Sequence, residues 1–106
     1  MVREVSPTEY LRESVSRPGR VLLDVREAWE REIAQLPEAL HVPMAEIAAR
    51  LGELDRSREI VVMCRSGGRS LKVAQYLEGQ GYPSVANLTG GILAWARDVD
   101  PTLATY

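Results

Sequence analysis

The chain has 106 residues, of which 45% are hydrophobic and 26% are charged, and its formal net charge is −2. This length predicts one domain, residues 1–106, with a core large enough to fold alone. The weak charge argues against a protein that binds nucleic acid or a membrane surface. No apolar stretch reaches the ~20 residues that cross a bilayer, and the charged N-terminus does not resemble a signal peptide. A single cysteine excludes an internal disulfide, so we expect a cytoplasmic protein.

The first half of the chain shows short apolar runs that alternate with stretches of helical character. A helix start is marked at S-P-T-E, where Ser6 can cap, Pro7 suits the first helical position and Glu9 completes a capping box. The apolar run at 21–25, which is closed by Asp24 and Val25, is typical of a strand covered on both faces. The elements expected here are strands at 2–5, 21–25 and 40–42, and helices at 7–16, 26–33 and 44–54.

The second half continues this alternation, with strands expected at 59–64 and 84–88 and helices at 70–80 and 92–99. Apolar spacing also predicts which helix faces are buried. In the helix at 26–33 we expect Ala28 or Trp29 to pack with Ile33. The inward face expected for the helix at 44–54 consists of Met44, Ile47, Ala48 and Leu51.

Strands that alternate with helices predict an α/β fold, with a central parallel sheet and helices on both faces. Ligands of such folds lie at the carboxyl ends of the strands. Cys64 ends the strand at 59–64, while Asp24 and Arg26 lie at the end of the strand at 21–25. Two strands therefore direct polar groups toward one edge of the sheet, which points to a chemical role for the cysteine.

The loop after Cys64 strengthens this interpretation. It reads Arg65-Ser66-Gly67-Gly68-Arg69, and a helix is expected to begin near Ser70. Glycines permit backbone conformations that turn successive N–H groups inward and form an anion nest. The helix N-terminus and the two arginines add positive charge at the same point. A free thiol with a pKa of ~8.5 is mostly protonated at pH 7, and lowering this pKa by ~2 units would make it mostly thiolate.

The alternative is that Cys64 is a small buried hydrophobic residue at a strand end and that the two glycines form only a turn. The strand end, the glycines, the arginines and the helix start occur together, and this combination favours the functional interpretation.

Four stretches of the chain resemble, in order and at the right spacing, the motifs of single-domain rhodaneses, which are thiosulfate sulfurtransferase-like proteins. They are LLDVRE (22–27), AQLPEALHVPM (34–44), VVMCRSGGRS (61–70) and GYPSVANLTGGILAW (81–95). Together they cover nearly the whole chain. The second stretch departs from the family, because Ala34-Gln35-Leu36 stands where Gly-His-Ile is usual and Glu38 replaces a later glycine.

The resemblance implies a rhodanese-like α/β fold and an enzyme that moves a sulfane sulfur from thiosulfate or a similar donor. Cys64 would attack the outer sulfur, release sulfite and hold a persulfide. Backbone N–H groups of residues 65–70 would stabilise the persulfide, and Arg65 and Arg69 would orient the sulfonate end of the donor. The hydroxyls of Ser66 and Ser70 would add hydrogen bonds. We expect neither a cofactor nor a metal ion.

Several residues near this site have structural interpretations as well. Ser70 has an equally good role as a cap of the helix. For Asp24 and Arg26 we favour a structural ion pair over a role in catalysis, since a carboxylate close to Cys64 would raise the pKa of the thiol. His41, the only histidine, receives a structural role because the proposed thiolate needs no base.

Because the chain has one cysteine, it contains no second thiol to resolve a persulfide. The sulfur must leave to an external acceptor, which is cyanide, a small thiol or a sulfur-accepting protein. Neither the physiological donor nor the acceptor follows from the sequence.

Two other functions are compatible with the resemblance. The cell-cycle dual-specificity phosphatases share the rhodanese fold, but their loop places an arginine six positions after the cysteine. Here that position is Ser70, and Arg69 is fifth, so the loop is one residue too short for a tetrahedral phosphate. The other rival is a non-catalytic binding module, but many such modules lack the cysteine.

Overall fold

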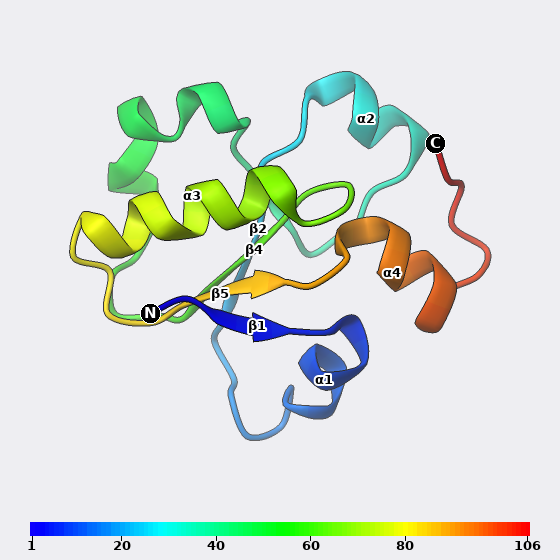
Figure 1. The fold of residues 1–106 in the computed structure, drawn as a ribbon, viewed down its shortest axis with the longest axis horizontal. Coiled ribbons are helices and arrows are strands. Elements are labelled where there is room, and N and C mark those ends of the chain that lie inside the picture. The colour runs from blue at the N-terminus through cyan, green and yellow to red at the C-terminus, as the bar shows by residue number, and fades with distance from the viewer.

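The computed structural model describes residues 1–106 and contains one sheet of five parallel strands (Figure 1). The strands are β1 (Arg3–Val5), β2 (Val21–Asp24), β3 (Leu40–His41), β4 (Ile60–Met63) and β5 (Val85–Leu88). Their order across the sheet is β1-β5-β4-β2-β3, and every neighbouring pair is parallel. The predicted α/β fold with a central parallel sheet is therefore confirmed, and all carboxyl ends meet at one edge.

Helices cover both faces of this sheet. They are α1 (Pro7–Arg12), α2 (Ala28–Ile33), α3 (Gly68–Gly79), α4 (Gly91–Asp98) and the 3₁₀ helices η1 (Met44–Glu46) and η2 (Ala48–Glu53). Helix α3 and the two 3₁₀ helices pack on one face, and α1 and α4 lie together on the other (Figure 1). None of the helices has the length and apolar character that crossing a membrane requires.

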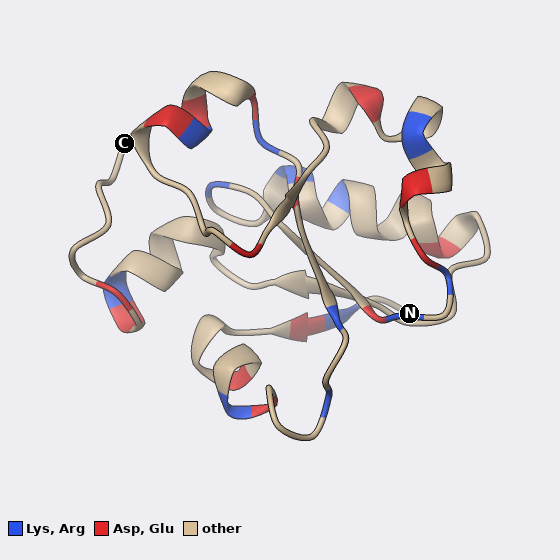
Figure 2. Cartoon of the chain, turned by 180° about the vertical axis from the view of Figure 1, so that it is seen from behind, with Lys and Arg blue, Asp and Glu red and all other residues tan.

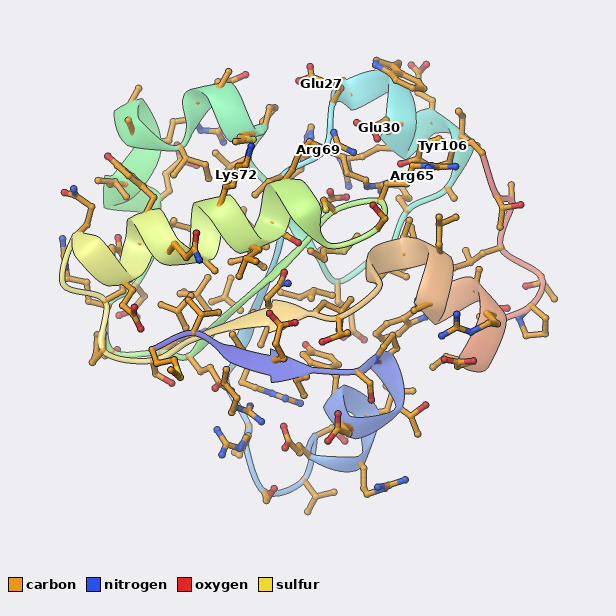
Figure 3. All side chains as sticks on the ribbon, in the orientation of Figure 1. Glu27, Glu30, Arg65, Arg69, Lys72 and Tyr106 are labelled. Carbon is orange, nitrogen blue, oxygen red and sulfur yellow. The ribbon has the colours of Figure 1, made fainter.

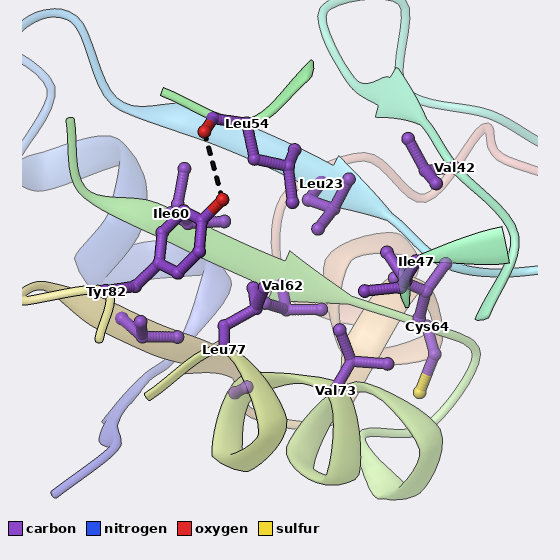
Figure 4. Packing of buried hydrophobic residues seen from close by; sticks show 13 residues of the cluster. Leu23, Val42, Ile47, Leu54, Ile60, Val62, Cys64, Val73, Leu77 and Tyr82 are labelled. Carbon is purple, nitrogen blue, oxygen red and sulfur yellow. Dashed lines mark hydrogen bonds between the residues drawn. The ribbon is translucent and has the colours of Figure 1, made fainter. Parts of the chain in front are cut away.

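Two buried clusters hold these layers together, because successive strand residues point to opposite faces of the sheet. In β4, Val62 faces α3 whereas Val61 and Met63 face α4. Figure 4 shows the cluster on the α3 face, where Val73 and Leu77 pack against the strands. Both faces of β4 are thus dry, which explains its uninterrupted apolar sequence.

The segment at 44–54 differs from the prediction. It forms two short 3₁₀ helices instead of one α-helix, and the second of them is itself interrupted at Arg50 (φ −116°, ψ 19°). Of the four residues predicted to face inward, only Ile47 is buried. Packing therefore gives a continuous helix little support, and Gly52 disfavours its last turn.

Helix α2 also differs from the prediction, because its inward residue is charged. Trp29 is 58% exposed and Ile33 is 40% exposed, whereas Glu30 is buried at 2%. The predicted packing of Ala28 or Trp29 with Ile33 is wrong, since the inner side of α2 meets the side chains of Arg26 and Arg69. Elsewhere acidic and basic residues are interspersed along the ribbon (Figure 2).

Candidate active site

Cys64 directly follows β4 and lies at the carboxyl edge of the sheet. Cys64 is 1% exposed and belongs to the buried cluster on the α3 face of the sheet. Ile47 and Val73 belong to the same cluster, and the sulfur points toward the first turn of α3 (Figure 4). The only thiol of the chain is therefore shielded from bulk water and placed at a helix N-terminus, where negative charge is stabilised.

The loop from Cys64 to α3 wraps around the sulfur. Gly67 adopts φ +110°, in the region that favours glycine, and is the N-cap of α3. Its backbone N–H donates to Sγ of Cys64 over 3.1 Å. Helix α3 begins at Gly68, two residues earlier than predicted, because Gly67 makes the turn.

Hydrogen bonds oppose the effect of burial on the Cys64 thiol. Burial raises its pKa, but the backbone N–H groups of Ser70, Gly67 and Ser66, and the Ser70 hydroxyl when it donates to the thiolate, together hold the pKa below its ordinary value. A lowered pKa increases the share of thiolate, which is the nucleophilic form of a cysteine.

Ser70 lies inside the first turn of α3, and the cap position is occupied by Gly67. The interpretation of Ser70 as a helix cap is therefore wrong. Its buried hydroxyl lies 3.3 Å from Sγ of Cys64 and donates to Oδ1 of Asn87 over 2.5 Å. Asn87 comes from the middle of β5 and is 3% exposed.

The start of α4 fixes the loop from the other side. The N–H groups of Ile92 and Leu93 donate to the carbonyls of Cys64 and Arg65 over 2.9 and 3.1 Å. Gly91 permits this close approach, since a Cβ atom there would lie 2.4 Å from the Cys64 carbonyl oxygen. Gly91 thus allows the start of α4 to support the cysteine loop directly.

Both arginines of the loop have protein partners, which come from α2 and from the C-terminal segment (Figure 3). Arg69 forms a bidentate ion pair with Glu30, with N–O distances of 2.7 and 2.8 Å. This contact is the main reason that the pKa of Glu30 is lowered to about 2. Arg65 donates to the main-chain oxygen of Tyr106 and lies over the Tyr106 ring, 5.1 Å from its centroid. Residues from α2 and the C-terminal segment therefore hold both guanidinium groups near the loop.

Asp24 and Arg26 lie at the same edge but on the other side of the sheet. Alternation along β2 places Asp24 on the face of Leu22, opposite to the cluster that contains Cys64. The two side chains are fully buried and form an ion pair with an N–O distance of 2.8 Å. Arg26 also donates to the main-chain oxygens of Glu30 and Ala34. This geometry supports the structural interpretation of the pair.

His41 is joined to the same network and does not form a pair with the thiol. Its Nε2 lies 2.7 Å from the main-chain oxygen of Arg26. This contact ties β3 to the segment after β2 and agrees with the structural role expected for His41.

A family model described as "Rhodanese-like domain" matches residues 7–98. The chain belongs to the rhodanese-like family. It is 38% identical to a sulfurtransferase of Allochromatium vinosum over 104 residues, and this alignment covers 98% of this chain and 97% of the relative. A rhodanese-like domain protein from Staphylococcus aureus has a similar structure, with a TM-score of 0.83, 27% identity and 99% of both chains covered.

Thiosulfate sulfurtransferase from Pseudomonas aeruginosa contains a similar fold within a longer chain. The TM-score is 0.79 and the identity is 29%, over 91% of this chain and 19% of the other. These similarities confirm the family and the fold that the four sequence motifs predicted.

The structure adds four residues to this rhodanese-like site that sequence reasoning did not assign to it. They are Glu30, Asn87, Gly91 and Tyr106. One of them had a visible signal, because Asn87 is a polar residue inside an otherwise apolar strand. A buried polar side chain needs a hydrogen-bond partner, and its partner here is the hydroxyl next to the cysteine.

Proposed function

We propose that the protein is a sulfurtransferase that carries sulfane sulfur as a persulfide on Cys64, with thiosulfate or a similar anion as the donor. The observation that carries this proposal is the surrounding of the sulfur. The only thiol of the chain faces a backbone N–H at the start of α3, and its pKa is lowered. The relatives named as sulfurtransferases support the same chemistry.

The reaction has two half-reactions. The Cys64 thiolate attacks the outer sulfur of thiosulfate, the S–S bond of the donor breaks, and sulfite leaves with the bonding electron pair. An acceptor such as cyanide or a thiolate then attacks the outer sulfur of the persulfide, and Cys64 leaves as a thiolate. The backbone N–H groups that stabilise the thiolate at the beginning stabilise it again as the leaving group.

Steady-state kinetics test this scheme. Because a covalent intermediate separates the two substrates, rates measured with thiosulfate and cyanide should follow a ping-pong pattern with parallel double-reciprocal lines. Intersecting lines would show that both substrates must bind before the sulfur moves, and the proposed mechanism would then be wrong.

Arg65 and Arg69 are proposed to orient the sulfonate end of the donor. Replacing either by Ala removes a charged hydrogen bond, so we expect the KM for thiosulfate to rise about 10- to 100-fold. Lys72→Ala is the matched control, because Lys72 is an exposed cation on the same helix without a salt bridge. Unchanged KM and kcat in both arginine variants would show that the arginines do not bind the donor.

A further inference from the structure

A chain of hydrogen bonds leads from the surface of β1 to the Cys64 sulfur. Glu4 and Asn87 are directly opposite each other on β1 and β5, and Nδ2 of Asn87 donates to both carboxylate oxygens of Glu4 over 3.2 Å. On its other side Asn87 contacts Ser70, which contacts Cys64. Glu4 is exposed, whereas Asn87, Ser70 and Cys64 are buried.

The surroundings of Asn87 determine which way its amide points. The groups near Nδ2 are the carboxylate of Glu4 and the carbonyl of Gly67, at 3.2 and 3.3 Å, and both can only accept hydrogen bonds. Thr89 donates to the same carboxylate over 2.7 Å and fixes its position. A flipped amide would place its oxygen against these acceptors. The NH₂ group therefore faces Glu4, and Oδ1 faces Ser70.

This orientation leaves Ser70 with two competing acceptors for one proton. In the structure the Ser70 hydroxyl donates to Oδ1 of Asn87, and its oxygen is free to accept the S–H of Cys64. To donate to a Cys64 thiolate, the hydroxyl must turn away from Asn87. That turn leaves a buried carbonyl oxygen without a donor, which is unfavourable.

We propose that Asn87, oriented by Glu4, is a positioning residue that competes with the Cys64 sulfur for the proton of Ser70. The competition limits how strongly Ser70 stabilises the thiolate. Because nucleophilicity falls as a thiolate becomes more stable, the arrangement keeps the sulfur reactive while the backbone N–H groups keep it ionised. The inference rests on the proposed function, in that it takes Cys64 as the nucleophile.

The other charged or titratable groups around the cysteine lie on the loop, on α2, after β2 and in the C-terminal segment. They are Arg65, Arg69, Glu30, Asp24, Arg26 and Tyr106. The substitutions that test the inference leave all six unchanged.

The test measures the rate of Cys64 alkylation by iodoacetamide as a function of pH. Glu4→Lys places a donor where the carboxylate accepted, so Asn87 turns its oxygen toward the lysine and its NH₂ toward Ser70, giving up its 3.3 Å hydrogen bond to the Gly67 carbonyl. The Ser70 hydroxyl then donates to the sulfur, and the apparent pKa of the thiol should fall by about 0.5–1 unit. The exposed position of Glu4 makes this variant compatible with folding.

The new positive charge of Glu4→Lys lowers the thiol pKa by itself, and Ser70→Ala is the control for this effect. In the Ser70→Ala background the direct charge effect remains, but the route through the hydroxyl is absent. We expect the shift caused by Glu4→Lys to be clearly smaller in that background. Equal shifts in both backgrounds, or no shift with Ser70 present, would overturn the proposal.

Asn87→Leu gives a second test without a change of charge. It removes the competing oxygen at similar volume, so Ser70 has only the sulfur as an acceptor, and the thiol pKa should fall. A higher or unchanged pKa in a folded Asn87→Leu protein would contradict the proposal. If this variant does not fold, the comparison of Glu4→Lys in the wild-type and Ser70→Ala backgrounds tests the proposal alone.

Alkylation requires no sulfur transfer, so these results are separate from the proposed function. A pKa that shifts as expected in a protein that accepts no sulfur from thiosulfate would refute the proposed function and support the arrangement around Asn87. Sulfur transfer from thiosulfate with no shift of the thiol pKa would support the proposed function and refute the arrangement around Asn87.

Discussion

Replacing Cys64 by Ser or Ala is expected to reduce the rate of sulfur transfer at least about 1,000-fold while the protein stays folded. A serine hydroxyl remains protonated near neutral pH and forms no persulfide. The loop itself is held by other groups, since the start of α4 binds the carbonyls of residues 64 and 65 and Gly67 caps α3. Initial rates with thiosulfate and cyanide, together with thermal unfolding curves, measure the two effects separately.

The single cysteine makes this experiment decisive. No second thiol in the chain can replace the first, so activity in a Cys64 variant cannot come from a neighbouring cysteine. A folded variant that still transfers sulfur clearly above the uncatalysed rate would refute the role of Cys64. A variant that loses activity because it unfolds would be recognised from its unfolding curve.

Replacing Arg26 by Met is expected to lower the free energy of unfolding by about 3–5 kcal/mol. The substitution leaves the Asp24 carboxylate buried without its bidentate partner. It also removes the donors to the main-chain oxygens of Glu30 and Ala34 and to the Tyr106 hydroxyl. For a domain of this size the loss is a large part of the total stability.

The same substitution in an exposed ion pair is the control. Arg97 pairs with Asp98 over 2.8 Å, but its side chain is 73% exposed, so Arg97→Met should change stability by less than about 1 kcal/mol. Urea unfolding measures both variants. If Arg26→Met kept normal stability yet lost sulfur transfer, Arg26 would act in the chemistry and the structural interpretation would be wrong.

The fold could be predicted from the sequence because its main signals are local. The strands β2 and β4 are covered on both faces, and their sequences are accordingly apolar throughout in β4 and apolar up to Asp24 in β2. The α-helix predicted at 44–54 is wrong, because a local signal was read there without knowledge of the packing. Its apolar spacing is helical, but most of that face is not packed, and periodicity alone does not reveal whether a face is buried.

The site also has a part that the local sequence predicts and a part that it does not. The cysteine, the glycine that turns the chain and the helix start occur within seven residues, so one stretch of sequence predicts the cradle around the sulfur. The pairs Arg69–Glu30 and Ser70–Asn87 join residues 39 and 17 positions apart. Such pairs depend on how α2 and β5 are placed by the fold, and a single sequence contains no pattern that links them.

The most direct test of the account is the mass of the intact protein after incubation with thiosulfate. We predict that the mass increases by one sulfur atom, that cyanide returns it to the original value, and that the Cys64→Ser protein shows no change. A wild-type protein that remains at its original mass, or that retains the added sulfur when cyanide is supplied, would contradict a transferable persulfide on Cys64.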